Sequence, residues 1–285
     1  MTSLEFVQRY AAFTDTPDGG NPAGVVLRAD ELTPAQMQSI AAEVGYSETA
    51  FVGAADSAEP RTHPVRYFTP EAEVPFCGHA TIATGIALGQ RHGAGAFRLK
   101  TEAGEIGLHV ISEADGAMSA ALTSVAPETA EIADTDLAEV LDALGWRPAE
   151  LDGALPPRVA FAGARHLILA AASHERLRRL SYDYERLANV CACLDLLTVA
   201  AIWRASPNLI HARNVAPAVG ILEDPATGAA AAALGGYLAE LAMIAPPASF
   251  TVIQGEDLGR PSRLDVTVTA KGAGVRVAGR AVTIP

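Results

Sequence analysis

Positive charge is scarce in this chain: its 285 residues include 21 lysines and arginines against 33 aspartates and glutamates, a formal net charge of −12. An acidic surface repels a phosphate backbone, so the composition argues against a nucleic-acid partner. Long apolar runs are also lacking, since no stretch approaches the roughly 20 residues of a membrane-spanning helix. The first five residues, MTSLE, have neither the basic start nor the apolar core of a signal peptide. We therefore expect no nucleic acid and no membrane among its partners.

Cysteine is also rare, with three in the whole chain. A small odd number does not build a disulfide framework, which predicts a cytoplasmic protein with reduced thiols. Cys191 and Cys193 have no histidine pair to complete a zinc site, and we expect them in a core. The HExxH, P-loop, GxGxxG and GxSxG patterns are missing, so zinc hydrolysis, nucleotide binding and serine hydrolysis find no support. We predict no metal.

The sequence does contain two segments that predict uncharged helices. The first covers residues 80–88, within the stretch FTPEAEVPFCGHATIATGIALGQ at residues 68–90, and its first charge is Arg91. The second covers residues 227–241, where the first charge is Glu240. A helix that is apolar all round but too short to span a bilayer is buried. Taken alone, both are most simply explained as core helices without a ligand.

A glycine turn precedes each of these helices, at Gly78 and at Gly228. The first turn of a helix presents unpaired N–H groups and the positive end of the helix dipole, so each start is able to hold an anion. One such helix in each half suggests a pseudo-symmetric protein with a site between its halves.

The remaining pattern is one of many short strands, which together with one buried helix per half predicts two small α+β domains. We place them at residues 1–115 and 116–285, and the last strand is able to cross back to the first domain. The polar stretch 112–116 is predicted as a hairpin turn and domain edge. Thr33 and Gln36 outline a capping box for a helix that ends near Gly45. The sequence predicts a short helix at residues 175–180 and a strand at residues 194–203.

Four polar residues stand out beside the turns, and each also has a structural explanation. Asp224 caps helices well. Cys77 behaves as a small hydrophobe when buried. His79 is explained as a first-turn residue bonded to backbone, and Glu48 as a solvated loop acid. Judged singly, each residue favours the structural explanation.

Their order along the chain resembles a known family. The motifs are GNPA at residues 20–23, YSETAF at 46–51, RYFTP at 66–70, EVPFCGHAT at 73–81 and EDPATG at 223–228, followed by QG at 254–255 and GRPS at 259–262. Each motif is modest by itself, but this series is typical of PhzF-like phenazine-biosynthesis proteins and covers almost the whole chain.

The resemblance implies the diaminopimelate epimerase-like fold, in which two similar α+β domains each wrap a β-barrel-like sheet around a central helix and the active site lies in the cleft. It implies an isomerase that moves a carbon-bound proton on trans-2,3-dihydro-3-hydroxyanthranilate without a cofactor. Glu48 matches the proton-transferring glutamate, and His79 and Asp224 match the other catalytic positions. Such chemistry is reasonable, because a carboxylate screened from water is able to take and return a proton.

Further site residues follow from the same matches. The helix-start amides near Gly78 and Gly228 would hold the substrate carboxylate. The full set that we expect to bind this small-molecule carboxylate is Asn21, Ser47, Cys77, Gly78, Thr227, Gly228 and Ala229. Ala229 departs from the family, which usually has serine there, so a hydroxyl contact is missing. We also expect a homodimer.

Two alternatives stay open. The first is an amino-acid epimerase or racemase that uses Glu48 or Cys77 with Asp224. Epimerases of this fold use two facing cysteines, and residues 224–230 contain none, which disfavours a two-thiol mechanism. The second alternative is a non-catalytic interaction protein that kept the fold.

Overall fold

The structure is a computed structural model of a mixed α+β protein, and it describes residues 4–55 and 57–285. Met1–Ser3, part of the segment compared with signal peptides, lies outside the described residues. The chain forms two compact units, Met1–Thr123 with Ala278–Pro285 and Ser124–Val277. The first unit therefore extends beyond the expected boundary at residue 115. Residues 113–117 form a hairpin turn inside it rather than a domain edge, and the last strand returns to it.

The first unit is built on a closed sheet of eight strands. Each pairs with the next in the order β1, β2, β3, β4, β6, β7, β8, β17, and β17 pairs again with β1. β5 is a short addition to β4. The strands are β1 (Gln8–Ala12), β2 (Asn21–Leu27), β3 (Glu48–Val52), β4 (Thr62–Phe68), β5 (Glu73–Val74), β6 (Gly95–Thr101), β7 (Gly104–Ser112), β8 (Met118–Thr123) and β17 (Arg276–Thr283).

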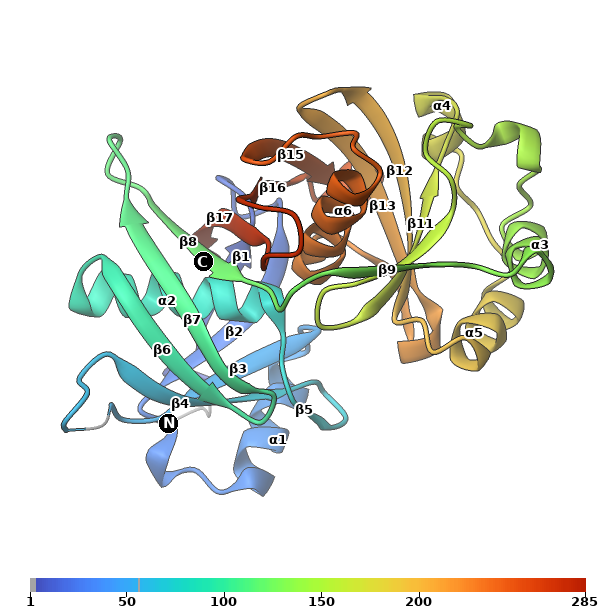
Figure 1. Ribbon diagram of the computed structural model, residues 1–285. Coiled ribbons are helices and arrows are strands. Elements are labelled where there is room, and N and C mark those ends of the chain that lie inside the picture. The colour runs from blue at the N-terminus through green and yellow to red at the C-terminus, as the bar shows by residue number, and fades with distance from the viewer. Residues whose placement is uncertain (1–3, 56) are drawn as a thin grey trace. The chain divides into compact units, whose positions relative to one another are not determined.

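Helix α2 (Gly78–His92) packs against five of these strands, namely β1, β2, β3, β7 and β8 (Figure 1). Every residue from 79 to 89 is buried, which confirms the expected core helix. Its small residues allow a close approach. A Cβ atom at Gly85 would lie 2.8 Å from a Leu108 methyl group and 2.9 Å from the Ala120 Cβ. The small residues of α2 thus allow the sheet to close around the helix.

Helix α1 (Pro34–Val44) covers the sheet from another side, where Met37 and Ile40 pack with Phe51 and Phe68. Its expected capping box is confirmed, because the Thr33 side chain accepts from the Gln36 amide while the Gln36 side chain accepts from the Thr33 amide. The helix ends at a left-handed Gly45.

The second unit has a sheet whose strands pair in the order β9, β10, β11, β12, β13, β15, β16, with β14 attached to β13. Helix α6 (Gly228–Glu240) packs against β9, β10, β11 and β16, and residues 230–239 are all buried, as expected. The strands are β9 (Glu128–Glu131), β10 (Arg158–Phe161), β11 (Arg165–Ala170), β12 (Thr198–Ser206), β13 (Leu209–Ala216), β14 (Ile221–Asp224), β15 (Ala248–Gln254) and β16 (Ser262–Val268).

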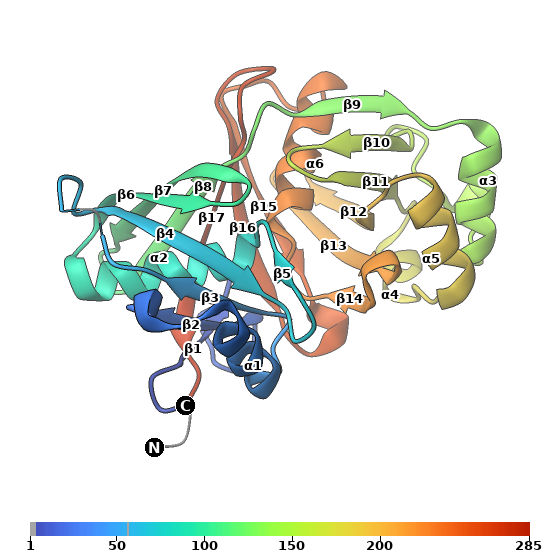
Figure 2. The same ribbon diagram turned by 90° about the horizontal axis from the view of Figure 1, so that it is seen from below.

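Three helices cover the other face of this sheet, as Figure 2 shows: α3 (Asp134–Ala143), α4 (His174–Arg178) and α5 (Tyr184–Cys193). The sequence did not predict α5, and the strand expected at residues 194–203 begins at Thr198 instead. Cys191 lies in the core between α5 and the sheet, whereas Cys193 is exposed, so the expectation that both are core residues was half wrong.

The close packing of α6 leads to a stability prediction. Ala232 is 1% exposed. A leucine there adds three carbon atoms to a filled core, and overpacking of this kind costs ~1–3 kcal/mol. We expect Ala232→Leu to lower the free energy of unfolding by that amount in urea denaturation. Ala138→Leu, on the exposed side of α3, is the matched control and should leave it nearly unchanged. Equal stability of the two variants would mean that α6 tolerates bulk and is not a core helix.

His166 on β11 is a buried titratable group of the second unit. Its Nδ1 lies 2.7 Å from Thr198 Oγ1, and its Nε2 has no hydrogen-bond partner within the described ranges. Burial disfavours the charged imidazolium and lowers the pKa of His166 from 6.5 to about 3. Below pH 6.5, His166 therefore binds a proton in the unfolded chain. In the folded chain it does so only near pH 3. Stability is lost as the pH falls through this window.

At pH 5 the loss from this one group amounts to about 2 kcal/mol, because each pKa unit between 6.5 and 5 contributes about 1.4 kcal/mol. Asparagine keeps a polar atom near the Nδ1 position and does not titrate. We expect His166→Asn to reduce the difference in unfolding free energy between pH 7 and pH 5 by about 2 kcal/mol. His109→Asn, at an exposed site, should leave that difference as in the wild type. An unchanged pH dependence in His166→Asn would assign the acid sensitivity to other groups.

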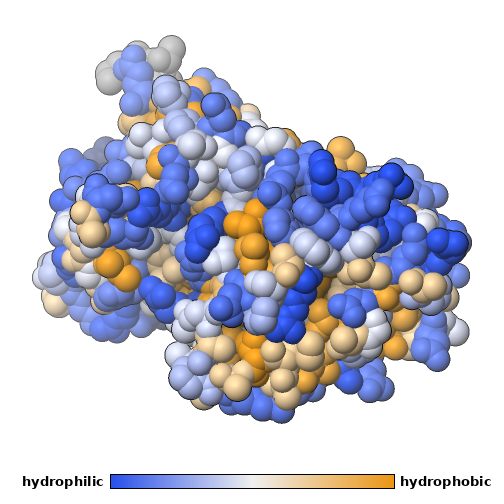
Figure 3. Space-filling view, turned by 90° about the horizontal axis from the view of Figure 1, so that it is seen from above, coloured by the Kyte–Doolittle hydropathy of each residue, from blue (hydrophilic) through white to orange (hydrophobic). Residues whose placement is uncertain are grey.

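The surface is hydrophilic over much of the face shown in Figure 3, where hydrophobic residues gather in smaller areas. Exposed large hydrophobic side chains include Phe6, Val125, Val219 and Leu222. Among the described residues, no helix is both long enough and apolar enough to cross a membrane.

Candidate active site

The first unit brings several of the expected site residues to one end of its closed sheet, where strands β2 and β3 begin. β2 and β3 run parallel, and Ala23 lies beside Glu48, so Asn21 and Glu48 both stand where these strands begin. The turn before Asn21 requires glycine, because Gly20 has a φ of +63° and a Cβ there would lie 2.3 Å from the Ala12 carbonyl oxygen. Helix α2, which packs against both strands, brings His79 to the same residues.

The His79 ring is held from both nitrogens. Asn21 Nδ2 lies 3.1 Å from Nδ1, and Ser47 Oγ lies 3.3 Å from Nε2. An amide nitrogen only donates, so Nδ1 accepts and the ring proton sits on Nε2, where the Ser47 oxygen accepts it. The ring is buried, with 6% of the residue exposed. Asn21 and Ser47 thus both contact His79, and their expected binding of substrate stays a prediction.

Glu48 lies beside this ring. Its Oε2 is 3.3 Å from His79 Nε2, close enough for an ion pair when the ring is protonated. The approach does not have hydrogen-bond geometry, and this buried oxygen has no hydrogen-bond donor in the described part of the chain. Only 16% of the Glu48 side chain is exposed. A buried carboxylate oxygen that no hydrogen-bond donor occupies is well suited to accept a proton from a substrate.

Cys77 completes this group. Its sulfur lies 3.4 Å from His79 Nδ1, and the residue is buried. Cys77 is also the N-cap of α2, but its side chain does not bond the helix amides. A Cβ added to Gly78 would meet nothing within 4 Å, so the space at the start of the helix is open to a ligand.

Two buried hydroxyl groups fix the start of α2. Tyr67 Oη and Thr81 Oγ1 are 2.7 Å apart, and Thr81 donates to the Cys77 carbonyl oxygen at 2.7 Å. Burial raises the pKa of Tyr67, so its phenol keeps its proton and donates it to Thr81. This chain of hydrogen bonds holds the backbone between Cys77 and Thr81, from which the His79 side chain projects. Thr81 was not predicted from the sequence to be part of the site.

Glu48, Cys77 and His79 each offer a ligand atom within 4.8 Å of the others. Thiolate, imidazole and carboxylate are the ligands that Zn²⁺ prefers. The trio would therefore be able to chelate such an ion, but the same atoms would then be unavailable for proton transfer.

The second unit holds the other group of expected residues. Thr227 Oγ1 donates to Asp224 Oδ2 at 2.5 Å. Gln254 Nε2 donates to Thr227 Oγ1 at 3.0 Å and to the Asp224 carbonyl oxygen at 2.6 Å, and its Oε1 accepts from the Thr227 amide at 3.3 Å. Gln254 thus fixes the loop that carries Asp224. In the sequence, Gln254 stood out only as part of the QG motif at residues 254–255. That motif was the one indication that Gln254 belongs to the site.

Gly228 and Ala229 are the first two residues of α6, after the N-cap Thr227. The Thr227 side chain bonds Asp224 instead of capping the helix. Ala229 is partly exposed, and its side chain is a methyl group without a hydroxyl.

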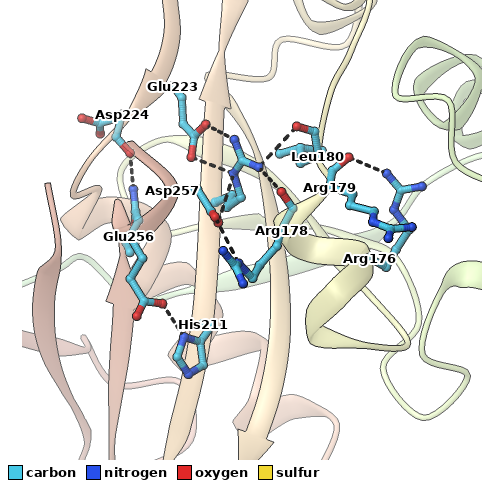
Figure 4. Close-up of polar contacts among 11 residues, drawn as sticks. Arg176, Arg178, Arg179, Leu180, His211, Glu223, Asp224, Glu256 and Asp257 are labelled. Atoms are coloured by element: carbon cyan, nitrogen blue, oxygen red, sulfur yellow. Dashed lines mark hydrogen bonds and ion pairs between the residues drawn. The ribbon is translucent and has the colours of Figure 1, made fainter. Parts of the chain in front are cut away.

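A buried ion pair anchors the strand that leads to Asp224. Arg213 Nη2 and Nε lie 2.6 and 3.0 Å from the two carboxylate oxygens of Glu223. Burial lowers the pKa of Arg213, but the bonds to Glu223 and the charge of Asp257 outweigh it and raise the pKa. Figure 4 shows the Glu223 carboxylate of this pair, with Asp257 near the same guanidinium group. The two-point contact sets β14 firmly on β13.

The expected residues thus form two groups. Asn21, Ser47, Glu48, Cys77, His79 and Gly78 belong to the first unit, and Asp224, Thr227, Gly228 and Ala229 to the second. Within each unit these residues lie near one another, and their roles in a site stay a prediction. That Glu48 faces Asp224 across a cleft stays a prediction.

Comparison with known proteins identifies the class. Residues 10–285 match the PhzC-PhzF family, described as phenazine biosynthesis-like proteins. An uncharacterized isomerase of Deinococcus radiodurans is 38% identical over 93% of this chain and 87% of its own. The trans-2,3-dihydro-3-hydroxyanthranilate isomerase of Pseudomonas fluorescens is 32% identical over 95% of this chain and 94% of its own.

Solved structures agree with these relatives. A PhzF-family phenazine biosynthesis protein of Bacillus anthracis superposes with a TM-score of 0.88 at 29% identity, covering 98% of this chain and 96% of that one. A probable proline racemase of Agrobacterium radiobacter K84 shares the fold, with a TM-score of 0.65 at 12% identity over 97% of this chain and 90% of that one.

These full-length matches identify the chain as an isomerase. The chain belongs to the PhzC-PhzF family of phenazine biosynthesis-like proteins. The alternative of a non-catalytic interaction protein is thereby left without support.

Proposed function

We propose that this isomerase moves a carbon-bound proton on a small cyclic carboxylate by general acid/base catalysis through Glu48. The observation that carries the proposal is the buried Glu48 Oε2, which lies 3.3 Å from His79 Nε2 and has no hydrogen-bond donor among the described residues. The isomerase of Pseudomonas fluorescens, a full-length relative, indicates a substrate similar to trans-2,3-dihydro-3-hydroxyanthranilate.

The proposed reaction has two proton transfers. Glu48 Oε2 first takes a proton from a substrate carbon, and the electron pair of that C–H bond moves into the adjacent unsaturated system. The carboxylic acid so formed then returns the proton to a different carbon, which shifts a double bond and regenerates the carboxylate. No oxidant or second substrate is consumed.

His79 assists from its position beside Glu48. Asn21 fixes the proton on Nε2, the nitrogen nearest Glu48 Oε2. An N–H group there stabilises the negative charge of the Glu48 carboxylate without competing as a base. Asn21 and Ser47 are therefore positioning residues, which act on the substrate through His79.

The substrate carboxylate requires donors, and we assign them to the helix starts. Backbone N–H groups and the helix dipole attract anions, and the start of α2 at Gly78 opens onto free space. We propose the same role for Gly228 at the start of α6, with Asp224 as a polar contact for the substrate. The two units would then be the two similar halves of a diaminopimelate epimerase-like fold, and we propose a homodimer as the working form.

The experiment that tests the function is a screen for exchange. Small cyclic and amino carboxylates, including trans-2,3-dihydro-3-hydroxyanthranilate, are incubated with the protein in deuterated water. Proton transfer to carbon should incorporate deuterium at one carbon of the active compound, as mass spectrometry and NMR report. If no compound of either class exchanges while the Pseudomonas fluorescens relative exchanges its own substrate, the proposed substrate class is wrong.

A racemase or epimerase is the second candidate, and the contact of 3.4 Å between Cys77 Sγ and His79 Nδ1 supports it. A thiol paired with an imidazole is a common nucleophile or base. Cys77→Ser keeps the shape of the side chain and removes the thiolate. An isomerase that uses Glu48 should keep most of its exchange activity in this variant, whereas a thiol-dependent racemase should lose it.

A further inference from the structure

A cluster of two histidines and one glutamate lies in the second unit and shares no residue with the group around Glu48. His174 is the first residue of α4, His211 lies on β13, and Glu256 begins the 3₁₀ helix η4 (Glu256–Leu258). One ligand atom of each lies within 4.8 Å of the others. We propose that these three residues bind a divalent cation of the zinc type.

The sheet itself places two members of the cluster. β13 pairs in parallel with β15, and His211 lies beside Ile253, so the chain that leaves β15 passes the histidine. Glu256 then reaches back, and its Oε2 lies 2.6 Å from His211 Nδ1 (Figure 4). The carboxylate and the imidazole are therefore already adjacent before any ion binds.

An aromatic contact holds the third member in place. Trp203 on β12 lies directly opposite His211 in the antiparallel pair. The His174 ring stacks on Trp203 with centroids 4.6 Å apart and planes at 13°, and its centroid lies 4.7 Å from that of His211. Stacking fixes the plane of the His174 imidazole beside the other two ligands without using either ring nitrogen.

The donor set indicates which ion would bind. Two imidazoles and a carboxylate are the three protein ligands of many zinc sites, with a water molecule as the fourth ligand. Oxygen-preferring ions such as Mg²⁺ and Ca²⁺ have little affinity for imidazole. Tetrahedral Zn²⁺ needs ligand atoms roughly 3.4 Å apart. Small rotations of partly exposed side chains are enough to reach that spacing, since 47% of the Glu256 side chain is exposed.

The charges nearby do not oppose a cation. Arg178 is paired with Asp257, Arg179 with Glu175, and Arg213 with Glu223. Each of these guanidinium groups is therefore compensated, and Glu256 supplies a negative charge within the cluster itself.

A bound ion would join three segments that are far apart in the sequence. It would connect α4 and β13 to η4, which directly follows Gln254 and Gly255. Gln254 fixes the loop of Asp224, so the ion would restrain the backbone next to that loop. We therefore expect zinc to stabilise the folded second unit.

The test uses the full chain stripped of metal with a chelator and titrated with Zn²⁺ by calorimetry. We compare the wild type with His174→Phe, which keeps the stack on Trp203 but loses the ligand, and with Glu256→Gln, which keeps a hydrogen-bonding group. Zinc binding to this cluster should weaken at least tenfold in both variants. Zinc in large excess over its dissociation constant should also raise the wild-type melting temperature by roughly 5 °C. At the same zinc concentration, each variant should show about half of that shift or less.

The trio of Glu48, Cys77 and His79 is the competing location, and Co²⁺ distinguishes the two. Cobalt bound to a thiolate gives a charge-transfer band that His and Glu ligands do not give. Binding without this band, retained in Cys77→Ser and lost in His174→Phe, supports the proposed site. Unchanged zinc binding in His174→Phe and Glu256→Gln, or binding that disappears only in Cys77→Ser, would overturn it. So would Mg²⁺ binding as tightly as zinc, or no zinc binding at all.

Discussion

Replacement of Glu48 by glutamine should reduce turnover by at least ~10²–10⁴-fold, the usual contribution of a general acid/base group. Glutamine has nearly the same size and still makes hydrogen bonds, but it cannot accept a proton. Glu48 Oε2 has no hydrogen-bond donor among the described residues, so the substitution breaks no such bond and the variant should fold normally. The variant should also still bind a carboxylate ligand, since we assign that role to the helix-start amides.

Solvent deuterium incorporation into any substrate active with the wild type measures this effect. Glu71→Gln removes the charge of an exposed glutamate in the same unit and should leave the exchange rate unchanged. Exchange at close to the wild-type rate in Glu48→Gln would remove Glu48 from the mechanism. The proton transfer would then have to be assigned to Cys77 or Asp224.

Gly255→Ala is expected to cause the largest loss of stability. Gly255 has a φ of +76°, and a Cβ there would lie 2.4 Å from the Arg260 carbonyl oxygen and 2.8 Å from the Pro225 carbonyl oxygen. Both atoms are backbone, so neither gives way easily. The left-handed conformation alone costs an alanine about 1–2 kcal/mol, and with the clash we expect a loss of at least ~3 kcal/mol. Activity should also fall, because Gln254 and the loop of Asp224 would be displaced.

Gly259→Ala is the matched control for this prediction. Gly259 lies at the other end of η4 and has nearly the same φ, +70°, but a Cβ there would meet nothing within 4 Å. This variant should lose only the conformational term of about 1–2 kcal/mol and keep its activity. Urea denaturation of both variants measures the difference. Equal stabilities would show that the backbone around Gly255 adjusts, and that the close approach is not what requires glycine.

Local composition determined the two central helices. Residues 80–88 and 229–239 carry no charge, and a helix of this kind is stable only when every side is covered. Both helices are buried in the structure, and both contain the glycines and alanines that close packing requires. The capping box at Thr33 is equally local, since it depends on four consecutive residues.

Elements whose stability depends on distant partners were harder to predict. Helix α5 buries only Leu187 and Cys191, one turn apart, and it packs against strands and a helix from other parts of the chain. Leu187, Val190, Cys191 and Leu194 recur at helical spacing and Asp183 caps the helix, so a local pattern was present and was overlooked in the sequence. The first unit extends to Thr123 because β8 pairs with β7 and β17, and the sequence around residue 115 contains only the turn.

In the candidate site, too, some features follow from local sequence and others only from tertiary contacts. Motifs in the sequence indicated Glu48, His79 and Asp224 and predicted the isomerase family, because those residue types stand beside glycine turns in a fixed order. The tertiary structure decided which side chains these residues contact. It placed Asn21 and Ser47 on the two nitrogens of His79, left Glu48 Oε2 without a donor among the described residues, and attached Gln254 to the Asp224 loop. The contact of 3.1 Å between Asn21 and His79 joins β2 to α2, which are brought together only by the closed sheet, and no local pattern specifies it.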